Sequence, residues 1–284
     1  MNRKPLFDVV RELLGGKLSQ SQVNAIDAAI TTGLAGTTGL AKASPTPRPA
    51  QPPSAPTHHR LGALSERYEC GNRGPGAVST GRNDPGGVSY GLFQLATRTG
   101  TCAAFLAAEA KKWASRFGSH APGSDQFSAI WRAIAEADHD AFAQAQRDFI
   151  ARTHYFPAVK SVTAKTGLDL NTRHPAVRDA TWSTAVQHGG AVRILSAAVV
   201  GADQQVQRDQ PHYDHALVEA IYAERSAYVL RVAERPNLSA GEKRLLESLV
   251  RNRFAAERAD ALQMLNGQML GGKALPGAGD NKPV

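Results

Sequence analysis

The stretch from Leu64 to Gln94 most strongly constrains how this chain can fold. Its first six residues have the composition of a short helix, which glycine ends soon after Glu69. The residues that follow are rich in Gly, Pro, Asn and Ser, so they favour turns and a small hairpin over a helix. The stretch therefore predicts one acidic residue, Glu69, at a helix end. It predicts a second, Asp84, on a hairpin that folds back beside that helix.

Length and charge limit the classes of protein to consider. A chain of 284 residues is long enough for one sizeable domain and an appendage. The net charge of +8 and the pI of about 9.7 favour an anionic partner, such as nucleic acid, an anionic membrane surface or a cell-wall polymer. No long basic run and no interleaving of basic and aromatic residues supports nucleic-acid binding. No apolar run is long enough for stable membrane insertion.

The first residues do not have the pattern of a secretory signal. Met1–Pro5 is basic, but Asp8, Arg11 and Glu12 interrupt the apolar residues that follow. We therefore expect synthesis in the cytoplasm without a signal peptide. Action in the periplasm or on the cell wall would then depend on release or on delivery by another route.

Composition divides the chain into four segments. The hydrophobic spacing in residues 1–34 predicts a helical hairpin, which is either a cell-wall-binding module or a packing module. Residues 35–60 are a Pro-rich linker, residues 61–266 are the globular domain, and residues 267–284 are a flexible tail. The globular domain should carry the chemistry, because the linker and the tail have few core-forming residues.

Hydrophobic spacing within the globular domain predicts mostly helices. Ser124 can cap one helix, and Ser239 with Glu242 forms the capping-box pattern of another. The expected helices span 101–117, 124–136, 140–162 with an interruption at Pro157, 175–200, 212–234 and 239–266. The fold class is therefore mainly α, or α+β, with one small β-hairpin.

The cysteines do not define a disulfide framework. Cys70 and Cys102 are either two small buried residues or one disulfide that joins the helix end to the helix after the hairpin. No Cys/His cluster has the spacing of a zinc site. We expect neither a metal nor an organic cofactor.

Two carboxylates on separate rigid segments suit glycoside hydrolysis. Glu69, beside Tyr68 and a glycine turn, could be desolvated enough to stay protonated as a general acid. Glu66, one turn earlier, is the rival, and either glutamate could simply be a surface residue. Asp84 lies in a turn that by itself is common. A phosphate-binding loop is the competing interpretation of the glycines, but the Gly-x-x-x-x-Gly-Lys pattern is absent.

Three motifs resemble known enzymes. The segment from Glu69 to Gln94 resembles the active-site region of the lysozyme superfamily, and Asp84–Ser89 is similar to the Asp-Gly-x-Gly-x-Thr segment of chitosanase-like glycoside hydrolases (family 46). The run Phe142–Val159 resembles a helix of that family with Ala-Gln-Arg-Asp and Tyr-Phe-x-Pro-Ala-Val. Val186–Gly189 resembles its buried His-Gly helix. Phage peptidoglycan hydrolases are the other relatives that the pattern indicates.

The resemblance implies roles for particular residues. Glu69 would be the general acid, Asp84 the general base, and Ser89 the hydroxyl that holds the attacking water. The candidate sugar contacts are Tyr68, Asn72, Tyr90 and Gln94. For Tyr90 and Gln94, packing within the hairpin is the alternative. Carboxylates separated by roughly 6.5–9.5 Å would give inversion.

The substrate expected from the resemblance is peptidoglycan. Chitosan is polycationic and would be repelled by a chain with charge +8, whereas peptidoglycan carries peptide carboxylates. We therefore expect a bacteriolytic, endolysin-like hydrolase of the β-1,4 glycan strand. It would be carried either by a phage or by a secretion machine that delivers toxins. The alternatives are a lytic transglycosylase, a chitosanase-like glycosidase, and a non-catalytic wall-binding structural protein.

Overall fold

The computed structural model describes residues 59–69, 74–82, 84 and 86–267. The helical hairpin expected at 1–34, most of the linker at 35–60 and nearly all of the tail lie outside these residues. Cys70 and Asn72 lie outside them too. The described part contains no helix long and apolar enough to cross a membrane.

The fold is mainly α with one small antiparallel sheet, as the sequence predicts for a lysozyme-like domain. The α-helices are α3 (Ala63–Glu69), α4 (Thr101–Ala107), α5 (Lys111–Ala114), α6 (Asp125–Ala137), α7 (His139–Ile150), α8 (Phe156–Thr166), α9 (Pro175–Gln187), α10 (Ala191–Asp203), α11 (Tyr213–Ala233), α12 (Ala240–Ser248) and α13 (Ala255–Leu265). The strands are β1 (Ser89–Tyr90) and β2 (Leu95–Ala96). Short 3₁₀ turns occupy Ser115–Phe117 and Leu170–Thr172.

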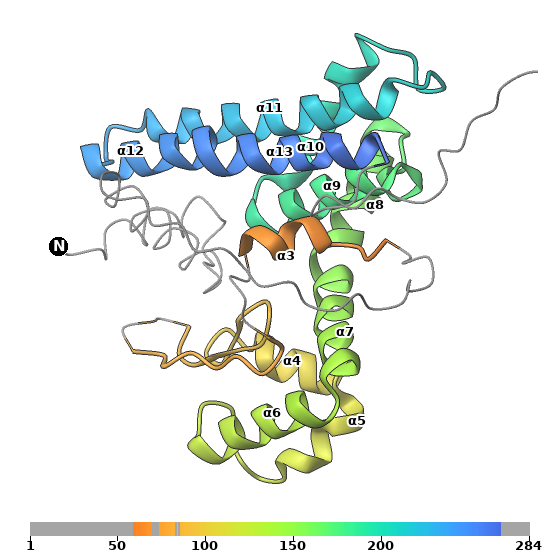
Figure 1. The fold of residues 1–284 in the computed structure, drawn as a ribbon. Helices are drawn as coiled ribbons and strands as arrows, with labels where there is room; N and C mark the ends of the chain where they lie inside the picture. Colours follow the sequence, from red (N-terminus) through yellow and green to blue (C-terminus); the bar gives the residue numbers. More distant parts are fainter. Residues whose placement is uncertain (1–58, 70–73, 83, 85, 268–284) are drawn as a thin grey trace, which may run out of the picture.

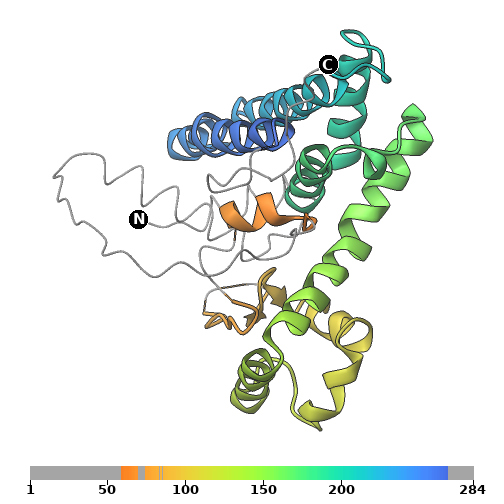
Figure 2. The same ribbon diagram turned by 45° about the vertical axis from the view of Figure 1, so that its right-hand side comes forward.

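Helix α7 joins two parts of the molecule. One part contains α4, α5, α6 and the small sheet, and the other contains α8 to α13 (Figures 1 and 2). Helix α3 precedes the first part in sequence but packs against α9 and α13 of the second. Both views show α3 and the small sheet on the same side of α7. Helix α3 therefore lies with the larger part, whereas Pro75, where the described chain has resumed, contacts Trp131 of the smaller part.

Helix α9 is the buried axis of the larger part. Ten of its thirteen residues are buried, and it packs against α3, α10, α11 and α13. Such burial on all sides fits the apolar character that the sequence shows here. The single helix expected over 175–200 is two helices, because the chain leaves helical geometry at His188 before α10 begins.

Aromatic side chains form the core of the smaller part. Trp131 of α6 lies at the centre, with its ring 4.7 Å from Phe142 of α7 and 5.0 Å from Tyr90 of β1, measured between centroids. Phe105 and Phe127 pack against the same indole. These contacts fix the sheet against α6 and α7, because aromatic pairs prefer such tilted geometry and bury large areas.

Caps fix two of the helix starts that the sequence predicts. The Ser124 side chain accepts a hydrogen bond from Phe127 N at the start of α6, and Ser239 with Glu242 forms the expected capping box of α12. The helix expected over 140–162 is instead α7, a π-helical turn at Ala151–Tyr155 and α8. Pro157 lies in the first turn of α8, where its missing N–H is tolerated.

The expected hairpin is an antiparallel ribbon, by which we mean the described residues of 77–97. Val78 bridges Tyr90, Ser79 N donates to Ser89 O at 2.9 Å, and β1 pairs with β2. Asp84 lies in the turn that connects the first two pieces of this ribbon. The regular strands are only two residues long, since most of the ribbon is held by turns rather than by a continuous ladder.

Candidate functional site

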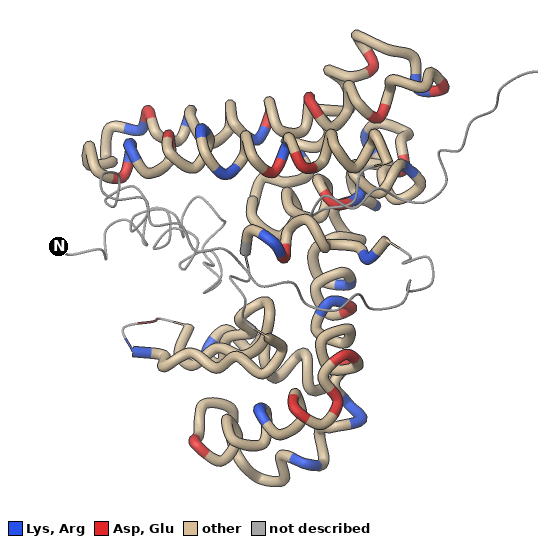
Figure 3. Tube along the Cα trace, in the orientation of Figure 1, with Lys and Arg blue, Asp and Glu red and all other residues tan. Residues whose placement is uncertain are grey.

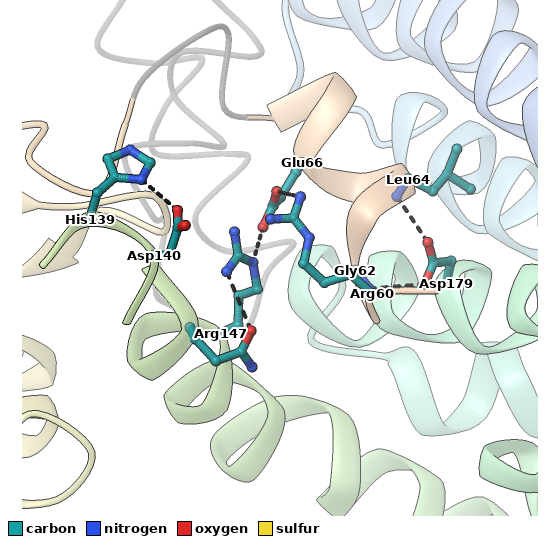
Figure 4. Close-up of polar contacts among 9 residues, drawn as sticks. Arg60, Gly62, Leu64, Glu66, His139, Asp140, Arg147 and Asp179 are labelled. Carbon is teal, nitrogen blue, oxygen red and sulfur yellow. Dashed lines mark hydrogen bonds and ion pairs between the residues drawn. The ribbon is translucent and has the colours of Figure 1, made fainter. Parts of the chain in front are cut away.

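The N-terminus of α3 is held by a buried carboxylate on α9. Asp179 is fully buried, and it accepts hydrogen bonds from Gly62 N and Leu64 N, each at 2.9 Å (Figure 4). His59 Nε2 lies 3.0 Å from the same side chain. Gly62 has a φ of +86° and its Cα faces the Trp182 ring, where any Cβ would lie 2.8 Å away. Only glycine suits both that conformation and that contact.

An ion pair holds the middle of α3. Arg147 Nε of α7 donates to Glu66 Oε1 at 2.5 Å, and Arg60 Nη2 donates to Glu66 Oε2 at 2.5 Å (Figure 4). The side chains of Arg147 and Glu66 are only 10% and 14% exposed. Charge-assisted hydrogen bonds with this little solvent are stronger than ordinary surface pairs. Glu66 therefore attaches α3 to α7.

The C-terminal end of α3 is attached to α13. Tyr68 Oη donates to Asp260 Oδ2 at 2.6 Å, and Arg67 Nη1 lies 2.9 Å from the same oxygen. Burial, with the Asp260 carboxylate second, raises the pKa of Tyr68 well above its usual value, so the phenol remains a donor. Glu69 is the last residue of α3. Its side chain lies outside the described residues.

These contacts separate the two rival glutamates. Glu66 pairs with Arg60 and Arg147, whereas Arg67 pairs with Asp260. Both oxygens of Glu66 thus accept hydrogen bonds from arginine. The Glu66 carboxylate is thus occupied in attaching α3 to its neighbours, and Glu69 remains the candidate acid on α3.

Asp84 lies at the tip of the ribbon in an Asx turn. Its Oδ1 accepts a hydrogen bond from Gly86 N at 2.7 Å, and Arg98 Nη1 donates to its backbone carbonyl at 3.4 Å. Its side chain is partly exposed. The hydrogen bond from Gly86 N therefore fixes one oxygen of the carboxyl group within the turn.

Ser89 and Gln94 are buried within the ribbon. Ser89 Oγ donates to Gln94 Oε1 at 3.1 Å and lies 3.0 Å from Ser79 Oγ, and Gln94 Nε2 donates to Gly91 O at 2.8 Å. Gln94 itself has a φ of +50°, an unusual conformation for a residue other than glycine. Both side chains hold the turn between β1 and β2.

The two tyrosines contact other parts of the protein. Tyr90 is fully buried, and its Oη contacts Ser128 Oγ and accepts from Gly123 N, both at 2.9 Å. Tyr90 therefore packs the ribbon against α6 and the loop before it. Tyr68 directs its hydroxyl to Asp260, as described above. Of the proposed contacts, Asn72 lies outside the described residues.

Gly91 lets the ribbon approach α7. It has a φ of +76°, and a Cβ there would lie 2.1 Å from Gln146 Oε1. We expect Gly91→Ala to lower the free energy of unfolding by about 1–3 kcal/mol, because it combines backbone strain with overpacking. Chemical denaturation measures this change. Gly100→Ala is the matched control, since Gly100 has nearly the same φ (+77°) but no atom within 4 Å of an added Cβ. A loss equal to that of the control would contradict the packing argument.

The sequence analysis missed two residues that organise this site, Asp179 and Gln146. Asp179 is an acid in a helix that is buried over most of its length, and such a residue needs a buried partner. Gln146 is fully buried although it is polar. The partners of Asp179 and Gln146 lie 54 or more residues away in the sequence, so no local pattern reveals them.

A second charged cluster is buried between α9, α11 and α13. Arg225 and Glu257 are fully buried with 3.6 Å between Nη2 and Oε2, and Arg253 Nε lies 3.7 Å from the same oxygen. His188 adjoins the cluster, and burial lowers its pKa well below the usual value. It is a core histidine, as the sequence indicates.

The remaining sequence expectations concern the cysteines and metal binding. Cys102 is buried with a free thiol, and burial raises its pKa to about 12, so the thiol is unreactive. Its pairing with Cys70 falls outside the described residues. Within the described ranges, no group of three His, Cys, Asp or Glu side chains could hold a metal ion.

Charge is distributed unevenly around the candidate site. Figure 3 shows acidic and basic residues mixed along α11 and α13. The described residues from Gly74 to Gly100 contain two arginines, Arg82 and Arg98, and one acid, Asp84. The described part of residues 74–100 therefore carries one more basic than acidic side chain, a small positive excess that favours anionic ligands.

Comparison with known proteins identifies the family. A family model described as "Type VI secretion system spike protein VgrG3-like, C-terminal" matches residues 61–258. The chain belongs to this family. The match begins at the first residue of the globular domain, just before α3, and includes the ribbon.

A curated relative carries the same name. The "Type VI secretion system spike protein VgrG3" of Vibrio cholerae serotype O1 is 35% identical over 150 residues. This alignment covers 53% of the present chain and 14% of the relative. The chain therefore corresponds to a small part of that much longer protein.

The family corrects two expectations from the sequence. The assignment to chitosanase-like enzymes or phage endolysins is wrong, because both matches name a type VI secretion spike. The expected function, a phage-type hydrolase of β-1,4 glycan strands, is wrong for the same reason. The motif matches were short, and they identified a lysozyme-like fold without distinguishing among the families that share it.

Proposed function

We propose that the chain is an enzyme domain of the VgrG3-like family, a lysozyme-like glycoside hydrolase that acts on peptidoglycan in the periplasm of a target cell. The single observation that carries this proposal is the attachment of α3. A helix of only seven residues, ending in Glu69, is held by Asp179, Arg147 and Asp260 from three other helices. A helix this short is unstable alone, so such attachment serves to fix the position of its end.

The proposed chemistry uses two carboxyl groups. Glu69, at the end of α3, would protonate the leaving oxygen of the glycan, and Asp84, at the tip of the ribbon, would activate a water molecule. Ser89, given its buried contacts, would support Asp84 by holding the ribbon. Arg82 and Arg98 beside Asp84 favour a glycan with anionic substituents, and peptidoglycan carries such groups.

A second candidate follows from the family's printed name. A spike protein is a component of a secretion machine, so the domain could bind peptidoglycan without cleaving it. Such a domain would need the fold and the two arginines near Asp84, but neither carboxyl group as a catalyst.

Digestion of purified sacculi distinguishes the two candidates. We expect the purified chain to release soluble saccharides, identified by mass spectrometry, with new reducing ends for hydrolysis or anhydro sugars for transglycosylation. Sedimentation with sacculi without any released saccharide would support the binding component. Release of peptides alone would contradict a glycoside hydrolase.

The Asp84→Asn variant tests the proposed base. Asparagine retains the oxygen that accepts from Gly86 N, so the turn should be preserved while the base is lost. We expect the rate of saccharide release to fall about 10²-fold, the usual contribution of a general base. The matched control is Asp125→Asn, an exposed acid in the first turn of α6. An unchanged rate for Asp84→Asn would favour a mechanism that needs only Glu69.

A further inference from the structure

Two successive residues of α7 contact the two segments that carry the proposed carboxyl groups. Gln146 contacts the ribbon and the loop before it, and Arg147 contacts α3. In the sequence, α3 ends at Glu69 and the ribbon begins at residue 77. Helix α7 thus gives a short physical connection between them.

Gln146 acts on the ribbon through both ends of its amide. It is fully buried, its Oε1 accepts from Leu92 N at 2.8 Å, and its Nε2 donates to Pro75 O at 3.0 Å. Trp131 Nε1 donates to the same carbonyl at 2.8 Å. Gly91, which has no side chain, allows this amide to lie directly against the backbone. A buried amide with this geometry fixes two backbone segments at once.

Arg147 acts on α3 through Glu66. Its Nε donates to Glu66 Oε1 at 2.5 Å, and its Nη1 lies 3.5 Å from Gln144 Oε1 on the same helix. The planar guanidinium therefore has a defined orientation between α7 and α3. Lysine could keep the charge at this position, but it could not reproduce that orientation.

We infer that Gln146 and Arg147 are positioning residues, which set the separation and angle between α3 and the ribbon and so between Glu69 and Asp84. This inference rests on the proposed function, because it assigns the two residues a part in that reaction. A displacement of about 1 Å can lower a catalytic rate about 10²-fold while substrate binding is retained. A residue that only stabilised the fold would change thermal stability without such an effect on turnover.

Kinetics of single variants test this role. On soluble glycan strands from peptidoglycan, we expect Arg147→Lys to lower kcat about tenfold or more while KM stays within twofold. Gln146→Met, which keeps the volume but loses both hydrogen bonds, should show the same pattern. The matched control is Arg152→Lys, whose ion pair with Glu109 lies outside α3 and the ribbon and should leave kcat within twofold. Losses equal to that of the control would overturn the inference.

A double variant separates positioning through Glu66 from a separate effect of Arg147. If Arg147 acts only through Glu66, then Glu66→Gln combined with Arg147→Lys should lower kcat no more than the stronger single variant. Multiplicative losses would overturn this part of the inference.

Hydrogen exchange gives a readout that does not depend on activity. We expect Arg147→Lys to increase amide exchange in 63–69 severalfold without affecting 89–96, and Gln146→Met to do the reverse. Unchanged exchange in both segments would overturn the inference. Wild-type protein that releases no saccharide would instead contradict the proposed function. In that case, the exchange pattern still decides whether the two residues hold the two segments.

Discussion

Replacing Glu69 by Gln is expected to lower saccharide release from peptidoglycan by about 10²–10⁴-fold, the range that loss of a general acid typically causes. Glutamine has nearly the same shape as glutamic acid, but it cannot donate a proton to a leaving oxygen. The attachments of α3 through Asp179, Glu66 and Tyr68 do not involve Glu69, so the fold should be preserved. Reducing-end assays, with circular dichroism to monitor folding, measure both effects.

Two controls make this prediction specific. Glu136→Gln alters an exposed glutamate on α6 and should leave the rate unchanged. Glu66→Gln alters the rival glutamate, which bonds to Arg60 and Arg147, so its effect should be smaller and should arise through the position of α3. If Glu66→Gln abolished release and Glu69→Gln retained most of it, the assignment of the acid would be wrong.

Local patterns predicted much of the helical fold. The capping residues Ser124 and Ser239 marked helix starts correctly, because a cap is a contact between near neighbours in sequence. The helix over 140–162 was predicted with an interruption at Pro157, whereas the irregular part is a π turn at Ala151–Tyr155, just before that proline. A π turn is stabilised by packing around it as much as by its own residues, so periodicity alone did not reveal it.

The site was only partly predictable for a related reason. Glycine and turn residues located α3 and the turn at Asp84, since both depend on local backbone preferences. The environment of each side chain depends on distant partners. Tyr90 looked like a sugar contact in sequence, but it is covered by Phe127 and Trp131. Its burial follows from the way α6 packs against the ribbon, which no spacing within the ribbon encodes.

The second large effect is expected from Asp179→Ala, which should lower the free energy of unfolding by about 3–5 kcal/mol. Alanine would leave the N–H groups of Gly62 and Leu64 buried without their acceptor, and it would remove the partner of His59. It would also release the N-terminus of α3, so amide exchange in 63–69 should increase more than elsewhere. Denaturant unfolding and hydrogen exchange measure the two effects.

A series at this position and one control separate the role of Asp179 from a general loss of charge. Asp179→Asn keeps one acceptor oxygen but turns an amide N–H₂ toward a backbone donor. We therefore expect its free energy of unfolding to lie between those of the wild type and Asp179→Ala. Asp214→Ala is the matched control. Asp214 also accepts a backbone N–H, from His174, and pairs with Arg173, but its side chain is 20% exposed. Water can replace those bonds, so its loss should be about 1 kcal/mol. Equal losses for Asp179→Ala and Asp214→Ala would show that burial of the carboxylate beneath α3 does not hold that helix in place.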